Sequence, residues 1–294
     1  MGYLFILLSV LANAVKGYCT KQVSNAIVKV RDAIHFNLIR NALCCVIAAL
    51  FFFLEAESSF WIATPAEFWI CFISGGAMAA LVVSWALAIK TDAYMLVTAC
   101  ASGSFIIPCI LGLFLLNERF TLFKLVSFIA IIAALFFLLR YNFTIKGKLG
   151  IKQIFLLALV LVSQGLNQTM QKLYVHYVTY KGASCYTLYS FIFATILLFF
   201  VTIFLKSPKD PQQRSLMKGN LTYIVLMSLG LFGASYFQTL AAASVDAIIL
   251  YPMVNALSLI AGSVMANLFF KERISRDSVF GVIFVLAALI FSRL

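Results

Sequence analysis

Charged residues are scarce in this chain. Asp, Glu, Lys and Arg make up only 11% of its 294 residues, whereas 64% are hydrophobic. A soluble domain carries roughly 25% charged and 45–50% apolar residues, so a soluble fold of this length has no way to bury so much apolar surface. Lipid can cover that surface. The composition therefore predicts an integral membrane protein before any motif is considered.

The chain also lacks the motifs of common enzymes and pumps. It has no HExxH, no GxSxG, no Walker phosphate loop and no carboxylate pair spaced for acid–base catalysis. Its seven cysteines include no CxxC pair, which favours small buried core residues over metal ligands. We therefore expect no enzyme, no metal site and no cofactor, and an ATP-driven pump is excluded for this chain alone.

Acidic residues are especially few, which leaves a net charge of +12. In a soluble protein this charge would suggest a nucleic-acid partner. In a membrane protein it indicates cytoplasmic loops instead, so we expect no nucleic acid. The first apolar run has no basic n-region and no clear cleavage site, so we expect it to be a retained helix rather than a signal peptide.

What the chain does contain is a series of long apolar segments. A transmembrane helix needs about 20 mostly apolar residues. We predict an all-α integral membrane fold of about ten transmembrane helices joined by short connections. The predicted spans are 2–23, 33–54, 67–89, 93–117, 121–140, 152–173, 183–205, 220–243, 247–270 and 277–293.

The two halves of the chain repeat each other. The run Asp92-Ala93-Tyr94-Met95-Leu96 recurs as Asp246-Ala247-Ile248-Ile249-Leu250 at an offset of 154 residues, and Glu118-Arg119 recurs as Glu272-Arg273 at the same offset. Five helices per half is an odd number, so equivalent helices cross in opposite directions. We therefore expect two inverted five-helix repeats, 1–145 and 146–294, in one compact membrane domain.

Basic residues gather on one side of the predicted bundle. The connections between helices 1–2, 3–4, 5–6, 7–8 and 9–10 hold fifteen of them, and the opposite side holds five. The positive-inside rule then places the first set in the cytoplasm and both termini outside.

Three features resemble the drug/metabolite transporter superfamily, in its ten-helix EamA-type branch. One is the two-times-five repeat at this length. Another is the Glu-Arg pair, each followed nine residues after the Glu by a small residue, at Ser127 and Gly281. The third is Phe36-x-x-x-Arg40 in helix two, with Lys21 closing helix one.

This resemblance implies a secondary transporter in the cell membrane. The sequence departs from the family pattern in helix one, where Asn13-Ala14 replaces a common Trp-Gly pair, and at Ser127, where a glycine is usual. Many members have cytoplasmic termini, which is the opposite of the charge count.

Polar and aromatic side chains within the spans are the candidate solute contacts. Ionisable groups in a membrane are costly and mark functional sites by default. The amides of helix six recur three and four residues apart and so form one stripe, for which interhelical hydrogen bonding is the alternative role. For the Tyr and Trp residues the alternative is packing or an interfacial belt. The candidates are Asn13, Lys16, His35, Arg40, Ser84, Trp85, Gln164, Asn167, Gln168, Tyr189, Tyr236, Gln238, Tyr251 and Asn255.

The signs of the charges within the spans narrow the class of solute that the chain can bind. Lys16 and Arg40 are basic, and no carboxylate lies in the middle of a span. We therefore expect an amino-acid-like solute that is anionic, zwitterionic or neutral, moved by alternating access. A multidrug exporter of organic cations, an intramembrane lipid-modifying enzyme subunit and a passive channel remain alternatives. Proton coupling through His35 or Lys16 stays open, as does the choice between monomer and homodimer.

Overall fold

A computed structural model describes residues 1–24, 30–55, 64–89, 94–115, 121–140, 150–178, 182–204, 220–270 and 276–291. Within these ranges every regular element is an α-helix, which confirms the expected all-α membrane fold. The helices are α1 Gly2–Ser24, α2 Val30–Glu55, α3 Pro65–Ile89, α4 Tyr94–Gly103, α5 Ile106–Leu115, α6 Leu122–Arg140, α7 Ile151–Tyr177, α8 Ala183–Phe204, α10 Leu221–Ala242, α11 Ala247–Phe270 and α12 Arg276–Phe291.

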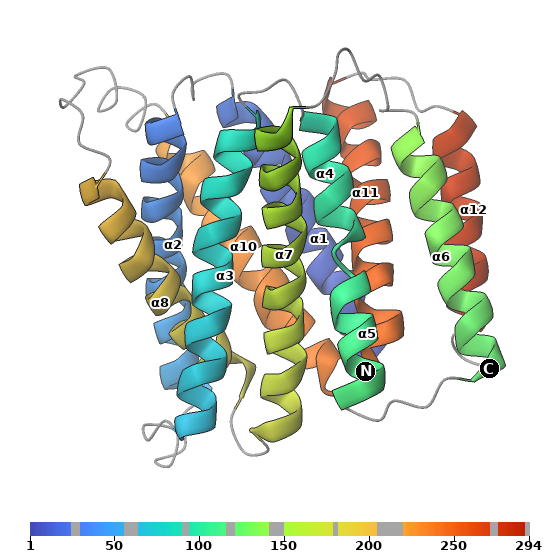
Figure 1. Ribbon diagram of the computed structural model, residues 1–294, viewed down its shortest axis with the longest axis horizontal. Coiled ribbons are helices and arrows are strands. Elements are labelled where there is room, and N and C mark those ends of the chain that lie inside the picture. Colours follow the sequence, from blue (N-terminus) through green and yellow to red (C-terminus); the bar gives the residue numbers. More distant parts are fainter. Residues whose placement is uncertain are drawn as a thin grey trace.

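The sequence predicts one helix over residues 93–117, but the structure has two helices there, α4 and α5. Pro108 stands in the first turn of α5 and has no N–H to donate to the carbonyl of Ser104, which its ring also crowds. The Ser104 carbonyl instead accepts from the Ile107 N–H at 3.1 Å, a tighter turn that ends the α-helical ladder. The chain therefore breaks at Ser104 and Phe105, in the middle of the bundle (Figure 1).

The helices stand side by side in one bundle (Figure 1). The most extensive pairings are α1 with α10, α3 with α7, α6 with α12 and α2 with α8. If residues 154 positions apart are matched, α1 corresponds to α7 and α3 corresponds to α10. The pair α1–α10 is then the counterpart of the pair α7–α3. Helix α1 begins and α12 ends at the same, lower edge of the bundle in Figure 1.

Glycines let two helix pairs, α1–α10 and α3–α8, approach closely. A Cβ on Gly230 of α10 would lie 2.8 Å from the Ala12 carbonyl oxygen of α1, and one on Gly75 of α3 would lie 2.7 Å from the Ser190 carbonyl oxygen of α8. Helices in a membrane associate through such small residues because lipid supplies no hydrophobic force between them. The backbones at these crossings are therefore in near contact.

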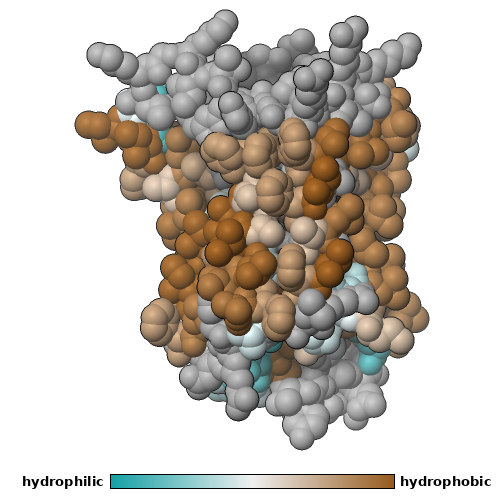
Figure 2. All heavy atoms as spheres, turned by 90° about the vertical axis from the view of Figure 1, so that its right-hand side faces the viewer, coloured by the Kyte–Doolittle hydropathy of each residue, from teal (hydrophilic) through white to brown (hydrophobic). Residues whose placement is uncertain are grey.

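The outer surface is apolar. Large side chains such as Phe155 of α7, Phe136 of α6 and Phe53 of α2 are 66%, 62% and 62% exposed. Figure 2, which views the side that carries α6 and α12, shows hydrophobic residues in a broad band across the middle of the molecule. By length and composition, six helices among the described residues can cross a bilayer: α1, α2, α3, α7, α8 and α10. The chain is an integral multi-pass membrane protein.

Candidate functional site

The polar centre of the bundle lies where α7 and α11 face the break between α4 and α5. Gln168 of α7 is 2% exposed, and its Nε2 donates to Oδ1 of Asn255 on α11 at 3.4 Å. Asn255 Nδ2 donates to the Ser102 carbonyl at 2.8 Å. That carbonyl lies in the last turn of α4, where the helical ladder ends. The broken helix and two predicted site residues therefore meet in one network.

This network has spare hydrogen-bonding capacity. The Ser104 hydroxyl lies 3.4 Å from Gln168 Oε1 and 2.7 Å from the Ala101 carbonyl, and these two acceptors share its one hydrogen. An amide nitrogen carries two donors, and within the described part of the chain Gln168 and Asn255 each use one. Each amide therefore retains one donor for a polar solute.

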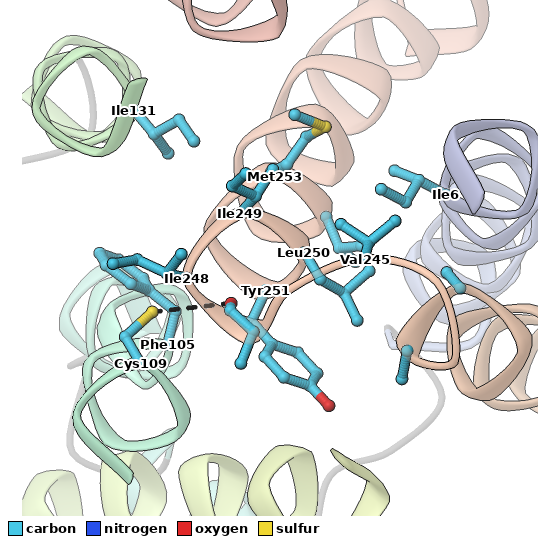
Figure 3. Close-up of a cluster of buried hydrophobic side chains, with 14 of the residues drawn as sticks. Ile6, Phe105, Cys109, Ile131, Val245, Ile248, Ile249, Leu250, Tyr251 and Met253 are labelled. Atoms are coloured by element: carbon cyan, nitrogen blue, oxygen red, sulfur yellow. Dashed lines mark hydrogen bonds between the residues drawn. The ribbon is translucent and has the colours of Figure 1, made fainter. Parts of the chain in front are cut away.

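Tyr251 lies one helical turn before Asn255 on α11 and is 0% exposed. Its ring packs in a hydrophobic cluster with neighbours on α11 and with Ile6 of α1 and Cys109 of α5. Figure 3 shows its hydroxyl pointing away from the other labelled side chains, toward the ribbon of α7. The Cys109 Sγ donates to the Ala247 carbonyl at 3.7 Å, which links α5 to the first turn of α11 (Figure 3).

Two further amides of the α7 stripe, Asn167 and Gln171, bind neighbouring helices. Asn167 Oδ1 accepts from the Ser74 hydroxyl of α3 at 2.9 Å, and Ser74 Oγ lies 2.7 Å from Tyr186 Oη of α8. Gln171 Nε2 donates to Thr239 Oγ1 of α10 at 2.8 Å. Asn167 and Gln171 therefore stabilise helix packing, which is the alternative role that the spacing had left open.

Two basic residues form a second polar region at α1 and α2. Lys16 Nζ donates to Asn13 Oδ1 at 2.6 Å, as their spacing of three residues on one helix allows. Arg40 of α2 and Lys16 of α1 both lie against α10, next to Ser228 and Gly230 respectively. Both predicted cations are thus brought together, although α1 and α2 are separate helices.

The other predicted residues are dispersed. His35 Nε2 accepts from Arg31 Nε at 3.4 Å, near the start of α2. The Ser84 hydroxyl donates to carbonyls of its own helix, Ala80 at 2.8 Å and Leu81 at 3.1 Å. Four further candidates are half-buried: Trp85, Gln164, Tyr189 and Gln238. Gln164 lies one turn before Gln168 on α7, and Trp85 packs in a cluster with residues of α4 and α7.

Comparison with known proteins identifies the chain. Residues 151–294 match the model of the EamA-like transporter family. The second half of the chain therefore belongs to the EamA-like transporter family, within the drug/metabolite transporter superfamily. A solved crystal structure whose title gives no function is similar over 99% of this chain and 95% of its own, with a TM-score of 0.77 and 11% identity, and it shows the fold alone. None of the curated proteins matches.

This EamA-type chain contains one buried acid that sequence reasoning missed. Glu67 stands in the first turn of α3 and is 0% exposed. Its Oε1 accepts from Cys185 Sγ of α8 at 3.0 Å and from Tyr174 Oη of α7 at 3.3 Å. The spacing Thr64-x-x-Glu67 is a capping box, a signal for the helix start that gives no hint of burial.

A second acid, Glu55, lies at the end of α2 and also binds other helices. Its carboxylate accepts from Ser184 Oγ of α8 at 2.6 Å and from the hydroxyl of Tyr236 on α10. The predicted site residue Tyr236 therefore joins α2 to α10. Among the described residues, no group of His, Cys, Asp and Glu is arranged to hold a metal ion.

Proposed function

We propose that this EamA-type chain is a secondary carrier that moves a small, polar, amino-acid-like metabolite across the membrane by alternating access. Membership of a transporter family supports the general class. The observation that carries the specific proposal is the network of Gln168 and Asn255 at the α4–α5 break. It combines amides with spare donors and a helix whose hydrogen-bond ladder is interrupted, and both features suit a polar solute.

The arrangement of the helices supports alternating access. Helices α7 and α11 belong to the half 146–294, whereas α4 and α5 belong to the half 1–145, so the network spans the boundary between the two proposed repeats. In inverted-repeat transporters, one repeat rocks against the other around a site at their interface. The two long bonds of the Gln168 side chain, both 3.4 Å, are ones that a solute can replace at little cost.

The buried acid Glu67 leaves the preference for an uncharged or anionic solute unchanged. A site for a bare organic cation needs a carboxylate or an aromatic cage that is available to it. Both oxygens of Glu67 already accept hydrogen bonds, from Cys185 and Tyr174 at one and from the Thr64 N–H at the other. We therefore rank export of organic cations below carriage of an amino-acid-like metabolite.

Uptake into proteoliposomes tests the proposal. The purified chain is reconstituted and offered radiolabelled amino acids and related metabolites, with and without a pH gradient to reveal proton coupling. We expect saturable uptake of at least one solute. Gln168→Ala should weaken its apparent affinity about two- to tenfold, which corresponds to one or two neutral hydrogen bonds.

Gln153→Ala is the matched control. Gln153 lies on the same helix, but its side chain accepts from the Gly150 N–H at the helix start. The control should transport like the wild type. Uptake by Gln168→Ala at the wild-type affinity, or no uptake of any solute by the wild type, would contradict the proposal.

A further inference from the structure

Arg40 carries a buried polar atom without a partner. Its Nε is fully shielded from solvent and makes no hydrogen bond within the described part of the chain. The next residue, Asn41, is 1% exposed, and neither its Nδ2 nor its Oδ1 has a partner there. Buried polar groups are almost always hydrogen-bonded, and an unsatisfied one near a charge is costly. The Arg40 Nε is therefore available to a ligand that supplies the missing bond. Asn41 follows Arg40 on α2, and neighbouring residues of a helix face different directions.

One short stretch of α10, Ser228 to Gly230, contacts α2 at Arg40 and α1 at Lys16. The Ser228 hydroxyl donates to the Arg40 carbonyl at 3.2 Å, and the Cys44 Sγ one turn on donates to the Ser228 carbonyl at 3.3 Å. Two residues later, a Cβ on Gly230 would lie 3.0 Å from the Lys16 backbone nitrogen. These contacts place the backbone of α2 at Arg40 and the backbone of α1 at Lys16 at the same level of α10.

The two cations lack an acid of their own. Within the described residues, neither Lys16 nor Arg40 is bonded to an acid, and the Lys16 Nζ donates to Asn13 Oδ1. Glu55 lies at the C-terminal end of α2 and is bonded to Ser184 of α8. Glu67 lies in the first turn of α3 and is bonded to Cys185 of α8. Two like charges held together without a counter-charge attract an anion.

We propose that Arg40 and Lys16 bind the carboxylate group of the transported solute, an inference that rests on the proposed carrier function. The guanidinium is a planar fork that matches the two oxygens of a carboxylate. The Lys16 ammonium has three donors and spends one on Asn13.

Matched acids and amides test this proposal. The purified full-length protein is melted with each of the common L-amino acids and with short monocarboxylic acids, and then with the corresponding primary amides. A ligand that binds the native state raises the melting temperature. We expect acids to stabilise the wild type, and their amides to stabilise it less. Equal stabilisation by acid and amide, or none by any acid, would overturn the proposal.

Arg40→Gln supplies the residue-level test. It should weaken acid binding about ten- to a hundredfold, the usual effect of losing a hydrogen bond to a charged group, and leave amide binding unchanged. Lys152→Gln removes a positive charge from the exposed first turn of α7 and is the control, with wild-type binding expected. A preference for the acid that survives in Arg40→Gln would refute the assignment.

A second readout separates binding from folding. Because the Arg40 Nε makes no hydrogen bond within the described part of the chain, Arg40→Gln should melt no lower than the wild type without ligand. If Arg40 instead served only to hold the fold together, its replacement would lower the melting temperature. If Arg40→Gln fails to fold, that result itself overturns the proposal. If the acid preference is absent but uptake still depends on Gln168, the carboxylate site alone is wrong.

Discussion

Gly165 of α7 tests whether the α4–α5 break is held as the structure has it. A Cβ at this position would lie 2.8 Å from Ile107 Cβ and 2.9 Å from the Ser104 carbonyl oxygen. Neither atom can rotate away, so Gly165→Ala must push α7 off the break by several tenths of an ångström. Overpacking of this kind costs about 1–3 kcal/mol. Gln168, one turn further along α7, moves with it, and its two bonds of 3.4 Å have no slack to absorb the shift.

The assay is thermal melting of the purified variants together with solute binding. Gly103→Ala is the control, because a Cβ at Gly103 meets nothing within 4 Å although it lies two residues before Phe105 at the same break. We expect Gly165→Ala to melt lower than Gly103→Ala and to bind solute more weakly. If both variants melt and bind alike, α7 does not approach the break as described, and the reasoning fails.

Two further substitutions test the contacts that hold the bundle. Lys172 Nζ donates to the Ala242 and Val245 carbonyls at 3.0 and 2.8 Å, so Lys172→Met should destabilise the protein by about 1.5–3 kcal/mol. Lys152→Met is its control, and equal melting of the two variants would show that this contact contributes nothing. Glu67→Gln should lower the melting temperature, because the amide has only one acceptor oxygen and its N–H₂ must then face either the Cys185 and Tyr174 donors or the Thr64 N–H; an unchanged melt would contradict that geometry.

The helices were predictable from the sequence because a bilayer demands a long apolar segment for each crossing. Every predicted span contains a described helix, and the family resemblance was confirmed. The exact break in span 93–117 was not predicted. A proline such as Pro108 disturbs a helix, but its position alone does not say whether the helix bends, as α11 continues through Pro252, or ends, as α4 does before Phe105.

The site was only partly predictable, because hydrogen-bond partners depend on which helices become neighbours. Gln168 and Asn167 looked equivalent in the sequence, yet one faces the α4–α5 break and the other binds Ser74. Ser84 bonds its own helix, which any serine in a span can do. The burial of Glu67 was missed because an acid at the edge of an apolar segment normally lies at the membrane surface.

Counterflow in proteoliposomes decides whether this chain is a carrier that alternates access to one site. Vesicles loaded with unlabelled solute are diluted into labelled solute, and uptake is compared with that of empty vesicles. The binding site of a carrier changes sides faster with bound solute than without it. We therefore predict a transient overshoot of label in loaded vesicles, and a smaller overshoot with Gln168→Ala. Uptake that is the same in loaded and empty vesicles and does not saturate would indicate a channel and contradict the proposed mechanism.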